Sequence, residues 1–173
     1  LICGLQINDD AIVESAQVFI ELENNPARIQ RLSYHLGEYY FRKKDFPNAQ
    51  KYYGTAGIAN LSNREIADMK FHQAYGYFVM QQFDKAKPLF NSIRQIPKDP
   101  NYLDANYYFG FISFTEKNYP QALESFEIAE KLSEYQGVIP FYKAEIYYFK
   151  GDREKALETG EAAINKSGQF YDL

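Results

Sequence analysis

The chain has 173 residues, of which 46% are hydrophobic and 24% charged, and its formal net charge is −4 at pH 7. The hydrophobic fraction excludes a disordered segment, the acidic balance argues against a nucleic-acid binder with a broad basic surface, and no apolar run is long enough to span a membrane. The unusual feature is aromatic, since 14 Phe and 16 Tyr make up 17% of the chain and there is no Trp.

The first predicted element is an amphipathic helix within residues 1–29. Asp9 and Asp10 precede it as candidate N-cap residues. Its apolar face is formed by Ile12, Val13, Ala16, Phe19 and Ile20. Ala16 precedes Ala49 by nearly one interval of the repeat described next, which favours the second helix of an incomplete repeat. A simple N-terminal capping helix fits equally well.

Beyond residue 29 the chain repeats one pattern four times. Each copy contains an alanine, and these alanines recur at a nearly constant interval that shortens slightly along the chain, at Ala49, Ala86, Ala122 and Ala156. A small residue lies twelve positions before each alanine, at Gly37, Ala74, Gly110 and Ala144. A second set lies nine positions before it, at Tyr40, Tyr77, Ser113 and Tyr147. Small and large residues at fixed offsets predict helices that approach closely at one level and fill a gap at the next.

Local signals predict two helices in each copy. Asp45, Asn118 and Asp152 stand at N-cap positions of the second helix. Pro47 and Pro120 fall in the first turn of that helix, where a missing N–H costs little. Segments that break helices separate the copies, at residues 61–65, 97–100 and 136–140.

The four copies resemble the tetratricopeptide repeat (TPR) family, in which a unit of about 34 residues forms two helices. The first copy carries the family's pattern at Leu36, Gly37, Tyr40, Ala49, Tyr53 and Ala56. The later copies depart from this pattern, because Ser113 replaces a Tyr and Gly160 replaces a Phe. No copy has the family's early Trp or its final Pro at the matching position.

The resemblance implies an all-α fold, an α-α superhelix in the form of a right-handed TPR-like solenoid of about nine helices. The chain is expected to form one continuous solenoid domain, in which residues 1–29 are an N-terminal capping helix or an incomplete repeat. The four TPR-like repeats are expected at residues 30–66, 67–102, 103–136 and 137–173.

In TPR proteins one face of each first helix lines a concave groove that holds the partner. Carried over residue by residue, the aromatic positions on this face are Tyr34, Phe41, Phe71, Tyr75, Phe78, Tyr107, Phe111, Phe114, Phe141, Tyr148 and Phe149. The functional interpretation is a groove that binds an apolar or extended protein or peptide segment, because aromatic side chains are favoured interface anchors. The alternative is a second core in which facing rings bury one another. The sequence leaves both interpretations open.

His35 and His72 occupy the same position in two successive copies, at the expected edge of the groove. Two imidazoles without a further ligand do not make a metal site, and Cys3 is the only cysteine. The sequence also lacks a Gly-rich phosphate loop, a nucleophile elbow and a paired-histidine metal helix. It therefore predicts no enzyme, no cofactor and no metal, with the two histidines as polar residues at the groove edge.

Several TPR proteins hold the tails of heat-shock chaperones in a clamp of Lys and Asn side chains. The matching positions here carry aromatic or acidic residues, among them Tyr34, Glu38 and Phe71. Binding of those chaperone tails is therefore not expected.

The function that the resemblance implies is a non-catalytic protein–protein interaction module or scaffold, part of a larger bacterial protein, without nucleic acid as a partner. Similarity to bacterial TPR proteins of the cell envelope favours the envelope or periplasm over the cytoplasm. The alternative is a structural repeat piece whose open ends mediate homo-oligomerisation, because Gly160 leaves the last helix under-packed. Residues 26–52 are rich in basic side chains and residues 121–173 in acidic ones. This asymmetry would favour head-to-tail stacking, although ordinary solvated helix faces explain it as well.

Overall fold

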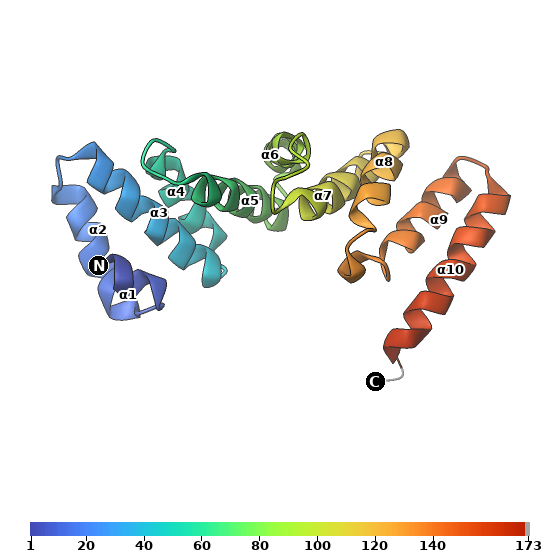
Figure 1. Ribbon diagram of the computed structural model, residues 1–173, viewed down its shortest axis with the longest axis horizontal. Coiled ribbons are helices and arrows are strands. Elements are labelled where there is room, and N and C mark those ends of the chain that lie inside the picture. Colours follow the sequence, from blue (N-terminus) through green and yellow to red (C-terminus); the bar gives the residue numbers. More distant parts are fainter. Residues whose placement is uncertain (172–173) are drawn as a thin grey trace. The chain divides into compact units, whose positions relative to one another are not determined.

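The computed structural model describes the backbone of residues 1–171 and the side chains of residues 1–164, and over this range it is helical without any strand (Figure 1). The all-α class expected from the sequence is therefore confirmed. The chain divides into two compact units, residues 1–89 and residues 90–173. Each unit is described by itself.

The first unit begins with a helical segment that packs against the first long helix. This segment contains α1 (Ile2–Gln6), a 3-10 turn (Asp10–Ile12) and α2 (Val13–Leu22). The side chain of Asp9 caps the 3-10 turn by accepting a hydrogen bond from the Ala11 N–H at 3.0 Å. The sequence did not predict α1, so the described chain has ten α-helices where about nine were expected.

Helices α3 (Pro26–Arg42) and α4 (Phe46–Ala56) form the first helical pair. Asp45 caps α4 as predicted, through a hydrogen bond from the Asn48 N–H. A Cβ added to Gly37 would lie 2.5 Å from the ring of Tyr53, so the pair needs a glycine where the two helices meet. The Arg42 guanidinium donates to the Leu5 carbonyl at 2.7 Å and holds α1 against α3.

Helix α5 (Asn63–Val79) follows and packs against α3 and α4. It starts with a capping box, in which Ser62 and Glu65 satisfy each other's backbone N–H groups. Helix α6 (Phe83–Arg94) runs across the division between the two units.

The second unit contains α7 (Tyr102–Thr115) paired with α8 (Tyr119–Ala129), and α9 (Ile139–Phe149) paired with α10 (Arg153–Tyr171). A 3-10 turn (Ser133–Tyr135) connects the pairs. Gly110 meets the ring of Phe126 almost as closely as Gly37 meets Tyr53, since an added Cβ would lie 2.9 Å from it. Asn118 occupies the N-cap position of α8 as predicted, but its side chain makes no capping hydrogen bond and its amide donates to Gln121 Oε1 at 2.9 Å.

The turn inside each helical pair uses the left-handed backbone region. Positive φ angles occur at Lys44, Gln81, Lys117 and Gly151, always five residues before the repeat alanine. The first three are non-glycine residues with φ of 60°, 58° and 60°, a conformation that L-residues adopt at a cost. This recurring turn confirms that the four copies share one local structure.

Candidate partner-binding surface

The candidate surface consists of the aromatic residues on the first helices of the repeats. In the first unit these are Tyr34 and Phe41 on α3 and three residues on α5, Phe71, Tyr75 and Phe78. Tyr34 is only 6% exposed and belongs to the core between α3 and α4. The other four are half-buried.

Phe41 shows how the rings of neighbouring helices cover part of this surface. Its ring stacks on His72 with centroids 3.9 Å apart and an interplanar angle of 16°. The rings of Phe46 and Tyr75 approach it edge-on at 5.8 and 5.9 Å. Neighbouring helices thus cover much of Phe41, and this part of the candidate surface has the character of a second core.

A half-buried carboxylate contacts this group of rings through His72. Glu38 accepts hydrogen bonds from His72 Nδ1 at 2.8 Å and from the Tyr53 hydroxyl at 2.7 Å. Burial alone would raise the pKa of Glu38, but the hydrogen bond and charge of His72, together with the Tyr53 hydrogen bond, bring this pKa below its usual value. The same burial, next to the Glu38 charge, raises the pKa of Tyr53. Sequence reasoning missed this network, which joins α3, α4 and α5.

The two histidines are not a pair at the edge of a groove. His35 lies on α3 and is buried, and its ring meets the ring of Tyr34 edge-on with centroids 5.1 Å apart. Burial, and then the Arg31 charge, lower the pKa of His35, so its neutral form is favoured. His72 instead bonds to Glu38. Within the described side chains, no three His, Cys, Asp or Glu residues come close enough to hold a metal ion.

In the second unit the candidate residues of α7 contact side chains that follow α8 in the chain. Tyr107 stacks on Tyr135 with centroids 4.0 Å apart, and burial raises the pKa of Tyr107. Phe111 and Phe114 lie 5.7 and 5.3 Å from the ring of Tyr142 on α9. All three α7 residues are half-buried.

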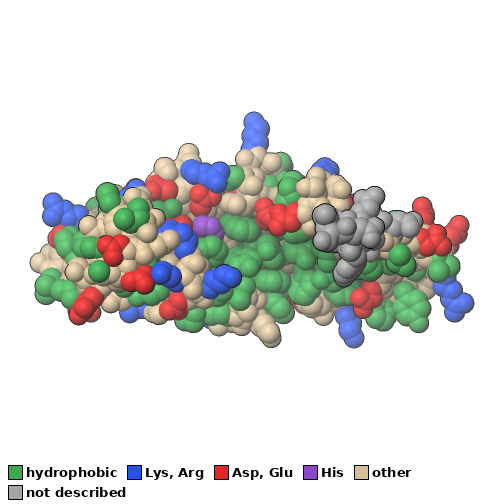
Figure 2. Space-filling model, turned by 90° about the horizontal axis from the view of Figure 1, so that it is seen from below, with side chains coloured by type: hydrophobic (Ala, Val, Ile, Leu, Met, Phe, Trp, Pro, Cys, Tyr) green, Lys and Arg blue, Asp and Glu red, His purple; other side chains and the backbone are tan. Residues whose placement is uncertain are grey.

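The last repeat differs, because its candidate residues face solvent. Phe141, Tyr148 and Phe149 on α9 are 45%, 68% and 57% exposed. The ring of Phe149 stacks on Tyr119 of α8 with centroids 6.1 Å apart. Figure 2 shows hydrophobic side chains reaching the surface of each unit between acidic and basic ones. The half-buried rings of α7 thus contact Tyr142 of α9, whereas the exposed Phe149 contacts Tyr119 of α8.

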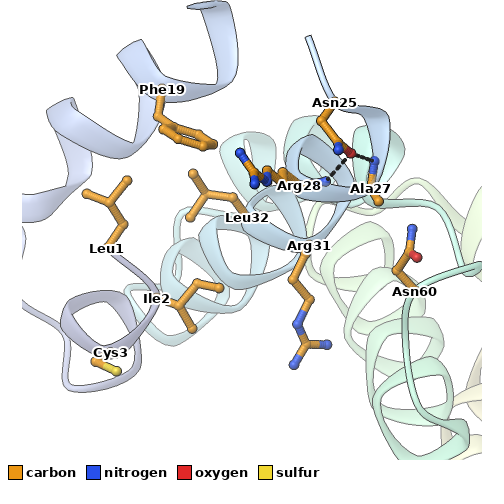
Figure 3. A pocket seen from close by; sticks show the side chains of 10 residues that line it. All are labelled: Leu1, Ile2, Cys3, Phe19, Asn25, Ala27, Arg28, Arg31, Leu32 and Asn60. Atoms are coloured by element: carbon orange, nitrogen blue, oxygen red, sulfur yellow. Dashed lines mark hydrogen bonds between the residues drawn. The ribbon is translucent and has the colours of Figure 1, made fainter. Parts of the chain in front are cut away.

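A separate hollow of about 690 Å³ lies at the start of the first unit (Figure 3). Its apolar walls come from the N-terminal segment, α2 and α3, as Leu1, Ile2, Phe19 and Leu32. Arg28 and Arg31 also line it, and they form ion pairs with Glu23 at 3.3 Å and Glu65 at 2.6 Å. The sequence did not predict this hollow, since its walls come from segments whose packing no local pattern specifies.

Comparisons with known proteins find similarity in the fold and not in the sequence. No family model matches the chain, and no curated protein matches it. Among solved structures, YrrB, described as a TPR protein with an unusual peptide-binding site, superposes with a TM-score of 0.73 at 21% identity, covering 94% of this chain and 80% of YrrB. MamA AMB-1 superposes with a TM-score of 0.70 at 18% identity, covering 94% and 86%. The chain has the TPR fold.

A further MamA structure gives a TM-score of 0.70 at 16% identity and covers 98% of this chain and 95% of MamA. The TPR fold therefore extends over nearly the whole chain, which agrees with the repeat register found from the alanines. Among residues 1–171, no helix combines the length and the apolar character that a membrane crossing requires.

Proposed function

We propose that this TPR-fold protein is a non-catalytic module that binds a protein or peptide segment on the aromatic face of its first helices. The observation that carries the proposal is the exposure of three aromatic residues on α9. Phe141 and Tyr148 lie seven residues apart, so they share one face of the helix with Glu145 between them. Each ring would contribute about 1.5–3 kcal/mol if a partner buried it fully.

Two further features support this proposal. Phe111 and Phe114 of α7 place half-buried rings beside Tyr142 of α9, so aromatic surface continues from one helix of the unit to the next. YrrB, which has a similar fold, is described as having a peptide-binding site. A bacterial parent protein in the cell envelope stays a prediction from the sequence.

The test is a selection of peptides from a random library on the immobilised protein. We expect peptides with several apolar residues to be enriched, and to lose binding to a Phe111→Ala and Phe141→Ala double variant. Ile58→Ala is the matched control, because Ile58 is also exposed but follows the end of α4, outside the proposed face. Equal binding to the double variant, with its fold intact by circular dichroism, would contradict the proposal.

Self-assembly is the second candidate function, and exposed apolar side chains of the last helical pair favour it. Tyr148 and Leu157 present apolar surface on α9 and α10 of the same pair. Light scattering over a wide range of protein concentration tests it, since self-assembly predicts a mass that grows with concentration. A constant monomer mass would exclude this function.

A further inference from the structure

Another hollow of the first unit, with a volume of about 350 Å³, lies between α2 and α4 and is here called the α2–α4 hollow. Its lining residues come in equal shares from the two helices and are Gln17, Ile20 and Glu21 of α2 and Lys51, Tyr52 and Thr55 of α4. Helix α3 packs against both of these helices. The walls therefore do not depend on what precedes or follows the sequence.

A hydrogen-bonded cluster holds the polar groups at this hollow in place. The Gln17 amide nitrogen Nε2 donates to the hydroxyls of Tyr40 and Tyr52, at 3.0 Å in each case. The rings of Tyr40 and Tyr52 stack with centroids 5.5 Å apart and an interplanar angle of 2°. Because Tyr52 is only 6% exposed, this stacked pair fixes the orientation of the amide before any ligand binds.

The cluster leaves one acceptor and one donor at the hollow. Both N–H groups of the Gln17 amide are used, and among the described side chains its Oε1 accepts no hydrogen bond. The Tyr52 hydroxyl accepts from Gln17, and no residue in the described part of the chain accepts its proton. A ligand can therefore donate to Gln17 and accept from Tyr52.

The two walls carry opposite charges that do not pair with each other. Within residues 1–164, the Glu21 carboxylate on α2 forms no ion pair and no side-chain hydrogen bond. The Lys51 ammonium on α4 has no carboxylate partner in the same range, and it lies 5.1 Å from the centroid of the Tyr52 ring. One small molecule with a positive and a negative end can thus bind to both walls.

We propose that the α2–α4 hollow binds a free α-amino acid. The ammonium group of the ligand donates to Glu21 and to Gln17 Oε1, and its carboxylate accepts from Lys51 and from the Tyr52 hydroxyl. A volume of about 350 Å³ is near the lower end for small-molecule sites, which suits a ligand of this size better than a segment of a partner protein. A fully methylated ammonium group lacks the N–H that Gln17 Oε1 accepts.

This site is separate from the aromatic face proposed to bind a protein or peptide segment, because none of its lining residues belongs to that face. A ligand that contacts both walls links α2 to the first helical pair. Since it binds only the folded arrangement, it also stabilises the first unit by mass action. Failure of one proposal leaves the other unaffected.

The first experiment is a ligand-observed NMR titration of the 173-residue protein with the proteinogenic amino acids, pooled by side-chain class and then tested singly. We expect saturable binding of at least one of them, with a Kd on the order of 1 mM or tighter. Its N-acetyl derivative lacks the ammonium group and its α-amide lacks the carboxylate. Each of these should bind at least about tenfold more weakly, because it loses one of the two walls.

Variants at two exposed positions test the site itself. Lys51→Met and Glu21→Gln each remove one charge from the hollow without changing a buried side chain, and each should weaken binding at least about tenfold. Lys98→Met is the matched control, because Lys98 is also exposed but follows the end of α6, outside the hollow. This variant should bind the amino acid as the wild type does.

Three results would overturn the proposal. The first is no saturable binding of any free amino acid at concentrations up to about 10 mM. The second is equal binding of the N-acetyl derivative or of the α-amide, which would make the hollow a site for carboxylates or for ammonium groups alone. The third is undiminished binding to Lys51→Met and Glu21→Gln, which would place the amino acid elsewhere on the protein.

Discussion

The first and the last helical pairs have the same repeat register but use their aromatic residues in opposite ways. In α3–α4, Gly37 lies against Tyr53, and the candidate binding residues Tyr34 and Phe41 are buried or covered by rings of the next helix. In α9–α10, Ala144 faces Gly160, and Phe141, Tyr148 and Phe149 remain exposed. Repeat position alone therefore does not decide whether an aromatic residue forms core or surface.

The largest difference between the two pairs is expected for alanine substitutions of their glycines. Gly37→Ala places a Cβ against the buried ring of Tyr53 and should lower the free energy of unfolding by about 1–3 kcal/mol. Gly160→Ala meets only ordinary contact distances and should raise it by about 0.5–1 kcal/mol. Urea unfolding of both variants measures this contrast, and two changes of the same sign would contradict it.

The next comparison concerns two glutamates at the same repeat position. Glu38→Gln removes a charged partner of His72 and should lower the free energy of unfolding by about 1.5–2 kcal/mol. Glu145→Gln changes an exposed side chain and should have an effect within about 0.5 kcal/mol. Chemical denaturation at neutral pH tests both variants. Equal effects would mean that the hydrogen bonds of Glu38 with His72 and Tyr53 add nothing to the stability of the protein.

The turns inside the helical pairs give a smaller effect. Gly151 has φ of 79°, so Gly151→Ala should destabilise the protein by about 1 kcal/mol even though a Cβ there meets no atom within 4 Å. Lys117→Gly removes the strain of the same positive-φ conformation, but it also raises the conformational entropy of the unfolded chain. The net change in the free energy of unfolding should therefore stay within about 0.5 kcal/mol. Thermal unfolding compares the variants, and a neutral Gly151→Ala would show that the turn is not strained.

The least pronounced effect is a gradual loss of stability in acid, which originates in the first unit. Burial lowers the pKa of His35 below its ordinary value of 6.5, so the unfolded chain binds more protons and stability falls as the pH drops below that value. The pKa of Glu38 is lowered from 4.5, so a second loss follows as the pH falls from there through the folded-state pKa. His35→Gln should reduce the loss of stability that begins below pH 6.5, and Glu38→Gln should reduce the loss that begins below pH 4.5. Unfolding measured across this pH range would contradict the account if both profiles matched the wild type.

The sequence predicted the repeat architecture because that architecture depends on local patterns. The alanine spacing and the small residues Gly37 and Gly110 were sufficient for the register, and the structure places both glycines against large rings. The left-handed turns also lie at a constant offset from the alanines, but only Gly151 marks them by residue type. The short helix α1 has no comparable signal, since its position depends on contacts of Arg42 and Leu5.

The candidate surface was less predictable because burial depends on residues far away in the chain. Glu38 and His72 come from different repeats, and nothing in either segment indicates that they bond. Gly160 stands where Tyr53 and Phe126 fill the same position in other repeats. Nothing in the α9 segment itself marks Phe141, Tyr148 and Phe149 as exposed. The eleven aromatic residues could be listed from the sequence, but their division between core and surface could not.

Hydrogen exchange of the protein, with and without a peptide enriched by the library selection, shows directly which helices bind the peptide. Because the proposed face is most exposed in the second unit, we expect new protection of backbone amides in α7 and α9, with α3 unchanged. Protection confined to α3 and α2, around the N-terminal hollow, or no change in α9, would contradict it.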